Sequence, residues 1–534
     1  MLVHVQTFWA ADLPAVGQAA RIVETVGSDG QPDLIIFNAG SQSYMTLDLS
    51  APLAAAAQMS EVVLRANALA HWVPMSTGNM RVDSFALDAA QTQSESVATF
   101  LARNPFVGND AGILRYDQGG ASFFVVSRPT GDGLSVYRMT GTRDFVLVQT
   151  IDDVGNLALS GVTATCIVTV GGNRFVIAGS QYDSGMTVLS MSATGSLTPV
   201  FVYGAAQGVP VRYLTDLEVV ELGGVTYVIS AAAGTSSVSV MRVDSTGALH
   251  LTDHLTDTRD TRFGGATALD TIRIGAEVFV AVAGGDGGIT LLQVLPGGRL
   301  IVRDVLEDGL NTALNGVRQV EFVEVAGRVE LFVVSNEGGI SRYRVETGPA
   351  GIEATGLLGS AGNDVLTAPN ARGEMLAGTG ADVLIAGPAQ DTLRGGSGAD
   401  LFIMESGGPT DTIADFEPGV DRIDLSRFAS LRELSDLVIV QRPNGASIMI
   451  GSEEIRIISA NGRPLDAGQV REGLIINEGS GGMPSAVPQP SAPGVGQPPP
   501  TAATATAATT TTTAAASAAS AGRCLSMAVG AADL

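Results

Sequence analysis

Residues 359–403 read GSAGNDVLT APNARGEML AGTGADVLI AGPAQDTLR GGSGADLFI, five units of nine residues in one register. Glycines gather in the first four columns. The sixth column holds an aspartate in four units, namely Asp364, Asp382, Asp391 and Asp400. The eighth column holds a large apolar residue in all five, namely Leu366, Met375, Leu384, Leu393 and Phe402. A glycine-rich half-unit can make a tight turn because glycine tolerates the required backbone angles. The apolar half-unit can then run as a short strand with one buried side chain.

This unit resembles the GGxGxDxUx nonapeptide of RTX proteins, which forms a parallel β-roll that binds Ca²⁺. The best copies are residues 359–367 and 395–402. In that family two nonapeptides make one full coil, so units 18 residues apart in this sequence are expected to stack on the same edge. The resemblance therefore implies one edge shared by Asp364, Asp382 and Asp400, with one calcium ion between each neighbouring pair.

The other edge of the implied roll is weaker. Gly373 stands where the second unit should carry its aspartate, so Asp391 faces only Asp411 or Asp415 further along the chain. Ca²⁺ takes roughly six to eight oxygen ligands, which shared carboxylates and turn carbonyls can supply. The resemblance thus implies a metal-binding set of aspartates and turn glycines: Asp364, Asp382, Asp400, Asp391, Asp411, Asp415, Gly359, Gly362, Gly378, Gly380, Gly396 and Gly398.

A metal-free, glycine- and aspartate-rich surface loop is the alternative reading of the same stretch. Five units in phase argue against it. Between Leu357 and Leu425 there are 11 acidic residues against 3 arginines, a charge that repels itself without a cation. We therefore predict a calcium-binding parallel β-roll over residues 351–403.

The composition of the whole chain sets limits on its class. A length of 534 residues predicts more than one domain. The 66 glycines and an aromatic content of 5% indicate many turns and short strands, hence an all-β fold. A net charge of −24 argues against nucleic acid or an anionic membrane surface as a partner. No run of about 18 apolar residues occurs, so no membrane span is expected.

The start of the chain, MLVHVQTFWAADLP, lacks the basic and apolar regions of an ordinary signal peptide. RTX proteins leave the cell unfolded through a type I secretion apparatus and fold outside, where calcium is plentiful. The resemblance therefore implies an extracellular protein whose partners are calcium ions and that apparatus. Such folding is physically reasonable, because a metal that binds only the folded state adds to its stability.

Residues 1–350 contain a recurring hairpin. The aromatic residue that opens its second strand recurs at gaps of 52, 52, 52 and 53 residues: Phe123, Phe175, Tyr227, Phe279 and Phe332. Fainter copies lie around Leu34 and Trp72. A four-stranded unit repeated about seven times around an axis is a β-propeller. The two fainter copies are only 38 residues apart, so six blades with an irregular segment is the alternative.

The last copy of the repeat offers only three strands, and the N-terminal LVHVQTF is expected to supply its outer strand and close the ring. Segments such as SSVSVMRVDSTGAL resemble lactonase-type seven-bladed propellers, whose blades end in a similar D-x-x-G-x-L turn. This resemblance covers the repeat skeleton alone. No catalytic residue carries over with it.

Residues 404–477 are expected to cap the open end of the roll. DTIADFEPGVDRIDLSRF resembles the segment that follows the repeats in serralysin-type C-terminal domains, and Asn444-Gly445 predicts a hairpin turn. Asp411, Asp415 and Asp421 are either additional calcium ligands or solvated turn residues. The tail from 478 to 534 has a low-complexity composition that predicts disorder. The secretion signal lies either in this tail or upstream of it.

Motifs for enzyme chemistry are sparse. The chain has four histidines and no HExxH, so the zinc site of a serralysin-type protease is missing. His250 and His254 on one strand lie roughly 13 Å apart at about 3.3 Å per residue, too far to share a metal. Residues 284–288 (GGDGG) predict a hairpin turn. Residues 27–34 partly resemble the calcium loop of integrin-type propellers, but an Asp-Gly turn is the better reading. Cys166 is expected in the core.

Two functions compete on this basis. The first is a secreted, non-enzymatic calcium-binding protein whose propeller is an extracellular binding or adhesion surface with an unknown ligand. The second is a secreted, lactonase-like hydrolase that carries the roll as an export module. Asp216, Glu218, Asp270 and Glu321 sit near comparable blade-entry strands and are the candidates for a catalytic set, although solvated loop residues are the preferred reading. The sequence assigns no catalytic residue, and a pore-forming toxin is disfavoured because no long amphipathic helical region is present.

Overall fold

The computed structural model describes residues 1–9, 20–26, 32–38, 43–48, 60–62, 73–74, 80–81, 113–127, 132–139, 145–325, 327–428, 431, 433–476 and 525–526. Almost every regular element in these residues is a β-strand. The prediction of an all-β fold is therefore confirmed. No helix among these residues has the length and apolar character needed to cross a membrane.

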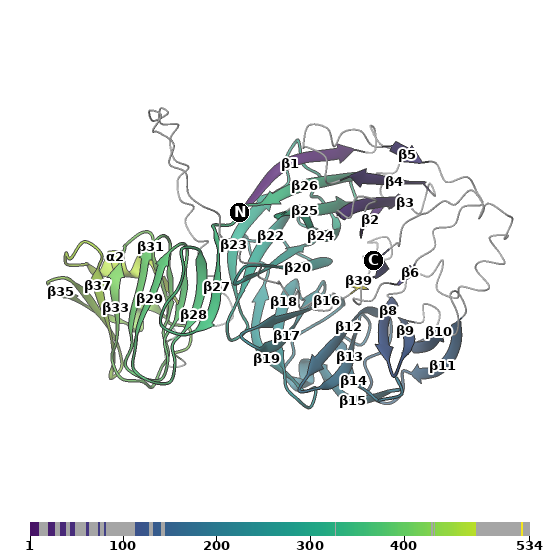
Figure 1. Ribbon diagram of the computed structural model, residues 1–534, viewed down its shortest axis with the longest axis horizontal. Helices are drawn as coiled ribbons and strands as arrows, with labels where there is room; N and C mark the ends of the chain where they lie inside the picture. The colour runs from purple at the N-terminus through teal and green to yellow at the C-terminus, as the bar shows by residue number, and fades with distance from the viewer. Residues whose placement is uncertain are drawn as a thin grey trace, which may run out of the picture.

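Six antiparallel sheets form the N-terminal part, here called the propeller, and Figure 1 shows them around a common centre. Five have four strands and one has five. In hydrogen-bonded order the strands are β2 (Ala20–Val26), β3 (Pro32–Asn38), β4 (Ser43–Asp48), β5 (Ser60–Val62); β8 (Ile113–Gln118), β9 (Ala121–Ser127), β10 (Gly133–Met139), β11 (Phe145–Asp152); β39 (Leu525–Ser526), β12 (Val162–Val170), β13 (Asn173–Ser180), β14 (Gly185–Met191), β15 (Leu197–Gly204); β16 (Leu214–Leu222), β17 (Val225–Ala232), β18 (Ser237–Val243), β19 (Leu249–Thr256); β20 (Ala268–Ile274), β21 (Glu277–Ala283), β22 (Gly288–Leu295), β23 (Arg299–Glu307); and β24 (Val317–Val325), β25 (Arg328–Ser335), β26 (Gly339–Val345), β1 (Leu2–Trp9).

The first strands of neighbouring sheets lie side by side, in the order β8, β12, β16, β20, β24, β2. A two-stranded sheet of β6 (Val73–Pro74) and β7 (Met80–Arg81) lies where a seventh sheet is expected, because β7 contacts both β2 and β8. Most of this segment, including Trp72, lies outside the described residues. The choice between six and seven blades therefore stays a prediction.

The predicted repeat is found in the sheets. Each marking aromatic lies in the second strand of its sheet and is buried: Phe123, Phe175, Tyr227, Phe279 and Phe332. The D-x-x-G-x-L turn has a packing reason. At Gly247 the backbone has φ +85°, and an added Cβ would lie 2.6 Å from the ring of Phe175 in the preceding sheet. Only glycine lets the turn close over that ring.

The N-terminal strand closes the ring as predicted. β1 pairs antiparallel with β26, from Leu2 opposite Val345 to Trp9 opposite Gly339. The sheet that begins with β24 is thus completed by residues more than 300 positions away in the sequence, which leaves no unpaired edge at β26.

A parallel β-roll follows the propeller. It has two sheets, and every pairing in the first is parallel. The first roll sheet contains β27 (Ala350–Thr355), β28 (Asn363–Thr367), β30 (Val383–Ile385), β32 (Leu401–Ile403), β34 (Arg422–Asp424) and β38 (Leu474–Ile475). The second roll sheet contains β29 (Glu374–Thr379), β31 (Thr392–Ser397), β33 (Asp411–Phe416), β37 (Glu453–Ser459), β36 (Gly445–Ile450) and β35 (Val438–Arg442).

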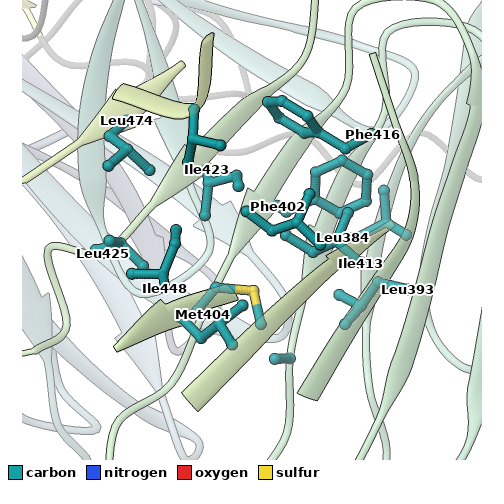
Figure 2. Packing of buried hydrophobic residues seen from close by; sticks show 14 of the residues in the cluster. Leu384, Leu393, Phe402, Met404, Ile413, Phe416, Ile423, Leu425, Ile448 and Leu474 are labelled. Carbon is teal, nitrogen blue, oxygen red and sulfur yellow. The ribbon is translucent and has the colours of Figure 1, made fainter. Parts of the chain in front are cut away.

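The nonapeptide register is as the sequence predicts. Val365 pairs with Val383, which pairs with Leu401, so strands 18 residues apart are neighbours. The eighth-column side chains all point between the two roll sheets and are fully buried: Leu366, Met375, Leu384, Leu393 and Phe402. Figure 2 shows several of them packed with residues of the capping segment. Each such side chain contributes about 1.5–3 kcal/mol when buried.

The residues after 403 extend the same two sheets. β34 and β38 continue the first roll sheet in parallel, while β37 joins β33 in parallel and then pairs antiparallel with β36. A hairpin joins β35 to β36 at the predicted Asn444-Gly445 position. The helix α2 (Ala467–Glu472) begins at Asp466, whose side chain accepts from the N–H of Gln469, and leads into β38.

Candidate metal site

Four aspartates form a ladder along one edge of the roll. The backbone N–H of Asp364 donates to Oδ1 of Asp382 (2.8 Å), that of Asp382 donates to Oδ1 of Asp400 (2.9 Å), and that of Asp400 donates to Oδ1 of Asp421 (3.1 Å). All four side chains are buried. The structure thus brings together the three aspartates predicted to share an edge and adds Asp421, whose place among ligands or turn residues the sequence left open.

The opposite edge carries a shorter ladder. The N–H of Gly373 donates to Oδ1 of Asp391 (3.0 Å), and the N–H of Asp391 donates to Oδ1 of Asp411 (2.8 Å). Of the two neighbours that the sequence allowed for Asp391, Asp411 is therefore the one in contact. Asp415 instead accepts from the N–H groups of Gly395 and Gly396, each at 3.1 Å.

The two central aspartates of the long ladder each keep one carboxylate oxygen without a partner. Oδ2 of Asp382 and Oδ2 of Asp400 are buried and have no hydrogen-bond partner in the part of the chain that the structure describes. A buried carboxylate oxygen without a donor is costly unless a cation or a proton satisfies it. A metal ion bound at these two oxygens would therefore stabilise the folded roll more than one bound elsewhere on the ladder.

Asp364 differs from Asp382 and Asp400, as does Asp421, whose Oδ2 accepts from the N–H of Glu417 (2.8 Å). Oδ1 of Asp364 accepts from the N–H of Ile352 (2.6 Å) and from Oγ of Ser360 (2.7 Å), and its Oδ2 accepts from the N–H of Ser360 (2.6 Å). Protein donors thus already occupy both oxygens. The sequence predicted one calcium ion between Asp364 and Asp382 and another between Asp382 and Asp400, whereas the unpartnered oxygens lie on Asp382 and Asp400.

The turn glycines stack closely on carbonyl groups of the preceding coil. A Cβ on Gly396 or Gly398 would lie 1.9 or 1.7 Å from the carbonyl oxygen of Gly378 or Gly380, respectively. Both residues have positive φ, at +102° and +134°. A side chain here would fill the space between successive coils, so glycine is required sterically as well as conformationally. On the coil before, Gly378 and Gly380 stack in the same way on Ser360 and Gly362.

Burial raises the pKa values of most aspartates on these edges. Burial, joined by repulsion from neighbouring carboxylates and opposed by hydrogen bonds, raises the pKa of Asp400 to about 8, that of Asp421 to about 7, and those of Asp382 and Asp411 to about 6. Burial also raises the pKa of Asp415. At neutral pH these groups would each be stabilised by a cation.

The donor set fits Ca²⁺. Among the described residues no three His, Cys, Asp or Glu side chains gather around one point. A cation at Oδ2 of Asp382 or Asp400 would therefore need further oxygen ligands, which turn carbonyls could supply. An all-oxygen site of this kind suits a hard cation and not zinc or copper.

The carboxylates considered for a propeller active site have other roles. Asp216 accepts from the N–H of Leu269 in the next sheet (2.9 Å), and Asp270 accepts from the N–H of Phe322 in the sheet after that (2.5 Å). Both are buried, as is Glu218. The reading of these three as solvated loop residues is wrong, because they lie within strands and two of them tie adjacent sheets together. Glu321 lies in β24 and is half-buried.

The remaining motif residues make ordinary contacts. His250 Nε2 lies 2.8 Å from Oδ2 of Asp244, and His254 Nδ1 lies 2.9 Å from Oγ of Ser239, so the two histidines have separate partners. Cys166 is buried in the propeller core as expected. Residues 284–287 connect β21 to β22, as predicted for a hairpin at 284–288. The loop at 27–31 lies outside the described residues, as does the tail except for Leu525–Ser526.

Comparison with known families supports the C-terminal reading. Residues 355–453 match the family model described as Peptidase M10 serralysin C terminal. The match covers both ladders and most of the capping segment. It supports an RTX-type C-terminal region of the kind found in secreted proteins, and it leaves the propeller unassigned.

Comparisons of the whole chain are weaker. A comparison with curated proteins found no match. Among solved structures, a fungal lectin from Aleuria aurantia with a six-bladed β-propeller fold matches with 10% identity and a TM-score of 0.32, covering 61% of this chain and 94% of the lectin. A functionally unknown protein from Desulfotomaculum acetoxidans DSM 771 matches with 10% identity and a TM-score of 0.30, covering 59% and 82%. A thermostable family-43 glycoside hydrolase matches with 12% identity and a TM-score of 0.29, covering 46% and 92%. Scores this low carry no argument, so the propeller description rests on the strand topology.

Proposed function

We propose that this chain is a secreted calcium-binding protein of the RTX type, in which calcium completes the folding of the roll after export. The observation that carries the proposal is the pair of buried, unpartnered carboxylate oxygens on Asp382 and Asp400, placed beside stacked glycine turns. The family match over residues 355–453 supports the same assignment.

Calcium acts here by stabilising one state of the chain. Without the ion, folding buries charged carboxylates that accept too few hydrogen bonds. The folded roll is therefore less stable than the unfolded chain at neutral pH. A cation bound only by the folded state stabilises it by about 2.7 kcal/mol at a free concentration of 100 times the Kd. Low calcium would therefore keep the roll unfolded for passage through a type I secretion apparatus, and high calcium outside would fold it.

We assign the propeller the role of an extracellular binding surface. Asp216 and Asp270, two of the carboxylates that a hydrolase reading would use, accept hydrogen bonds between adjacent sheets and are thereby committed to the framework. No observation on the described residues favours the lactonase-like alternative.

Calorimetric titration of the full chain with calcium tests the assignment. We expect saturable binding in the parent chain and a large loss of affinity in Asp382→Asn, which keeps the Oδ1 acceptor of the ladder but removes the charge. The matched control is Glu374→Gln, which neutralises a carboxylate that is 55% exposed on the outer face of the second roll sheet and pairs there with Arg394. Binding that is equal in the parent and in Asp382→Asn would refute the proposal.

A further inference from the structure

The propeller packs against the outer face of the first roll sheet. Figure 1 shows β27 and β28 beside the sheet that contains β22 and β23. The contact centres on a cluster of buried apolar side chains from both parts, including Ala276, Leu295 and Ile301 of the propeller and Val383, Ile385 and Leu401 of the roll. We call this cluster the docking face.

Only one of the two roll sheets offers such a face. Strand residues alternate between the core and the outer surface, so the seventh and ninth columns of each nonapeptide point outward. In the first roll sheet these columns hold Val383 and Ile385, which are buried under the propeller. In the second they hold Thr392 and Arg394, and the Arg394 side chain is 44% exposed. The apolar outer columns therefore match the sheet that the propeller covers.

A polar bridge connects the propeller to the turn in front of Asp382. Oε2 of Glu277 accepts from Nδ2 of Asn363 (3.0 Å), and Oδ1 of Asn363 accepts from the N–H of Ala381 (2.9 Å). Glu277 and Asn363 are 3% and 4% exposed, so the bridge is shielded from water. A second contact joins Arg299 of the propeller to Asp424 of the roll at 2.5 Å.

We infer that docking of the propeller and binding of calcium by the roll are energetically coupled. The strands β30 and β32 carry the docking face on their outer side and follow directly after Asp382 and Asp400. A docked propeller holds these strands and the turn at Ala381 in place. Calcium binding then costs less conformational entropy, because this part of the chain is already ordered. The inference rests on the proposed function and adds a reciprocal requirement: calcium strengthens docking by the same factor by which docking strengthens calcium binding.

A single turn residue allows docking to be broken without altering the roll. Ala276 lies in the turn between β20 and β21 and is 2% exposed because the roll covers it. Ala276→Arg should push the two parts away from each other. Asn173→Arg is the control, since Asn173 is exposed at the start of β13, directly after the corresponding turn between β12 and β13 and away from the docking face. Glu277→Ala is a second variant that removes the polar bridge, together with the contacts of Glu277 to Gln293 (3.3 Å) and Arg303 (3.8 Å) within the propeller.

Calcium affinity of the full chain is the readout. We expect Ala276→Arg to weaken it at least about fivefold, the lower end of typical couplings, and Glu277→Ala to weaken it in the same direction, with no change in Asn173→Arg. In the parent chain, removal of calcium should speed amide hydrogen exchange in β21 and β22 more than in β13 and β14.

The possible outcomes separate the two claims. Unchanged calcium affinity in both docking variants, in a parent that does bind calcium, would overturn the coupling and leave the proposed function intact. Exchange in β21 and β22 that is indifferent to calcium would overturn it as well, even if Ala276→Arg did not fold. Absence of calcium binding in the parent would refute the proposed function and the coupling together.

Discussion

Replacement of Asp400 by asparagine should change stability in opposite directions with and without calcium. The Asp400 carboxyl is 2% exposed, and its Oδ1 accepts the N–H of Asp382 while its Oδ2 has no partner among the described residues. Asparagine keeps the Oδ1 acceptor and removes the charge. It therefore removes a burial penalty in the calcium-free chain and a ligand in the calcium-bound chain.

The size of the first effect follows from the pKa. Burial raises the pKa of Asp400 from 3.8 to about 8. At pH 7 the folded state must therefore take up a proton that the unfolded state lacks, at a cost of about 4 kcal/mol when each pKa unit corresponds to about 1.4 kcal/mol. The buried amide leaves donors unpaired, which costs about 1–3 kcal/mol. We expect Asp400→Asn to stabilise the calcium-free roll by about 1–3 kcal/mol.

Hydrogen exchange of the amides in β30 and β32, with chelator and with about 5 mM calcium, measures both effects in the full chain. The parent should gain protection when calcium is added, and Asp400→Asn should gain little while starting from a higher level. Destabilisation of similar size in both conditions would refute the reasoning, because it would make Asp400 a hydrogen-bonding residue of the framework and nothing more.

Three further predictions concern pH, the turns and the propeller. Because carboxyl groups with raised pKa values stabilise the calcium-free roll only while they are protonated, its stability should fall as pH rises from about 4 to about 8, as denaturation across pH would measure. The same protons compete with calcium, so the apparent calcium affinity should fall as pH is lowered from about 8.5 to about 6, as calcium titration across pH would measure. Gly398→Ala should prevent or strongly weaken calcium-induced folding, seen by circular dichroism, because its Cβ would collide with the carbonyl of Gly380; a normal response would contradict the stacked-turn geometry. Asp216→Ala should cost about 1–3 kcal/mol of propeller stability by leaving the Leu269 N–H unpaired, with calcium affinity unchanged; a thermal melt that matches the parent would contradict its role between sheets.

Much of the fold could be predicted because its signals repeat. The nine-residue period placed every eighth-column side chain in the roll core, and the spacing of the propeller aromatics placed each in the second strand of its sheet. Closure of the ring by β1 also followed from simple counting, since the last repeat lacked a strand. Periodicity is informative here because each unit must bury the same positions against its neighbours.

The candidate site was harder to predict in its details. The spacing brings the aspartates to one edge, but it cannot tell that Ser360 and Ile352 saturate Asp364 while Asp382 and Asp400 keep unpartnered oxygens. Those differences depend on how β27 begins the roll, which no repeat encodes. In the propeller, the burial of Asp216 depends on a contact with the next sheet, a long-range feature that local polarity does not indicate.

One signal for the docking face was present in the sequence and could have been read. The outward columns are mainly apolar in odd units, as at Val383 and Ile385, and mainly polar in even units, as at Thr392 and Arg394; Thr367 and Leu376 are the exceptions. A roll that stood alone would have no reason for this difference, because both outer faces would meet water. The asymmetry therefore predicts that one sheet of the roll is covered.

The most direct test of the central claim is to locate calcium in crystals of the full chain grown or soaked with the ion, by anomalous scattering. The account predicts calcium about 2.3–2.6 Å from Oδ2 of Asp382 and from Oδ2 of Asp400, with turn carbonyls completing each shell. Crystals that hold about 10 mM calcium and show no anomalous peak at either oxygen would contradict it.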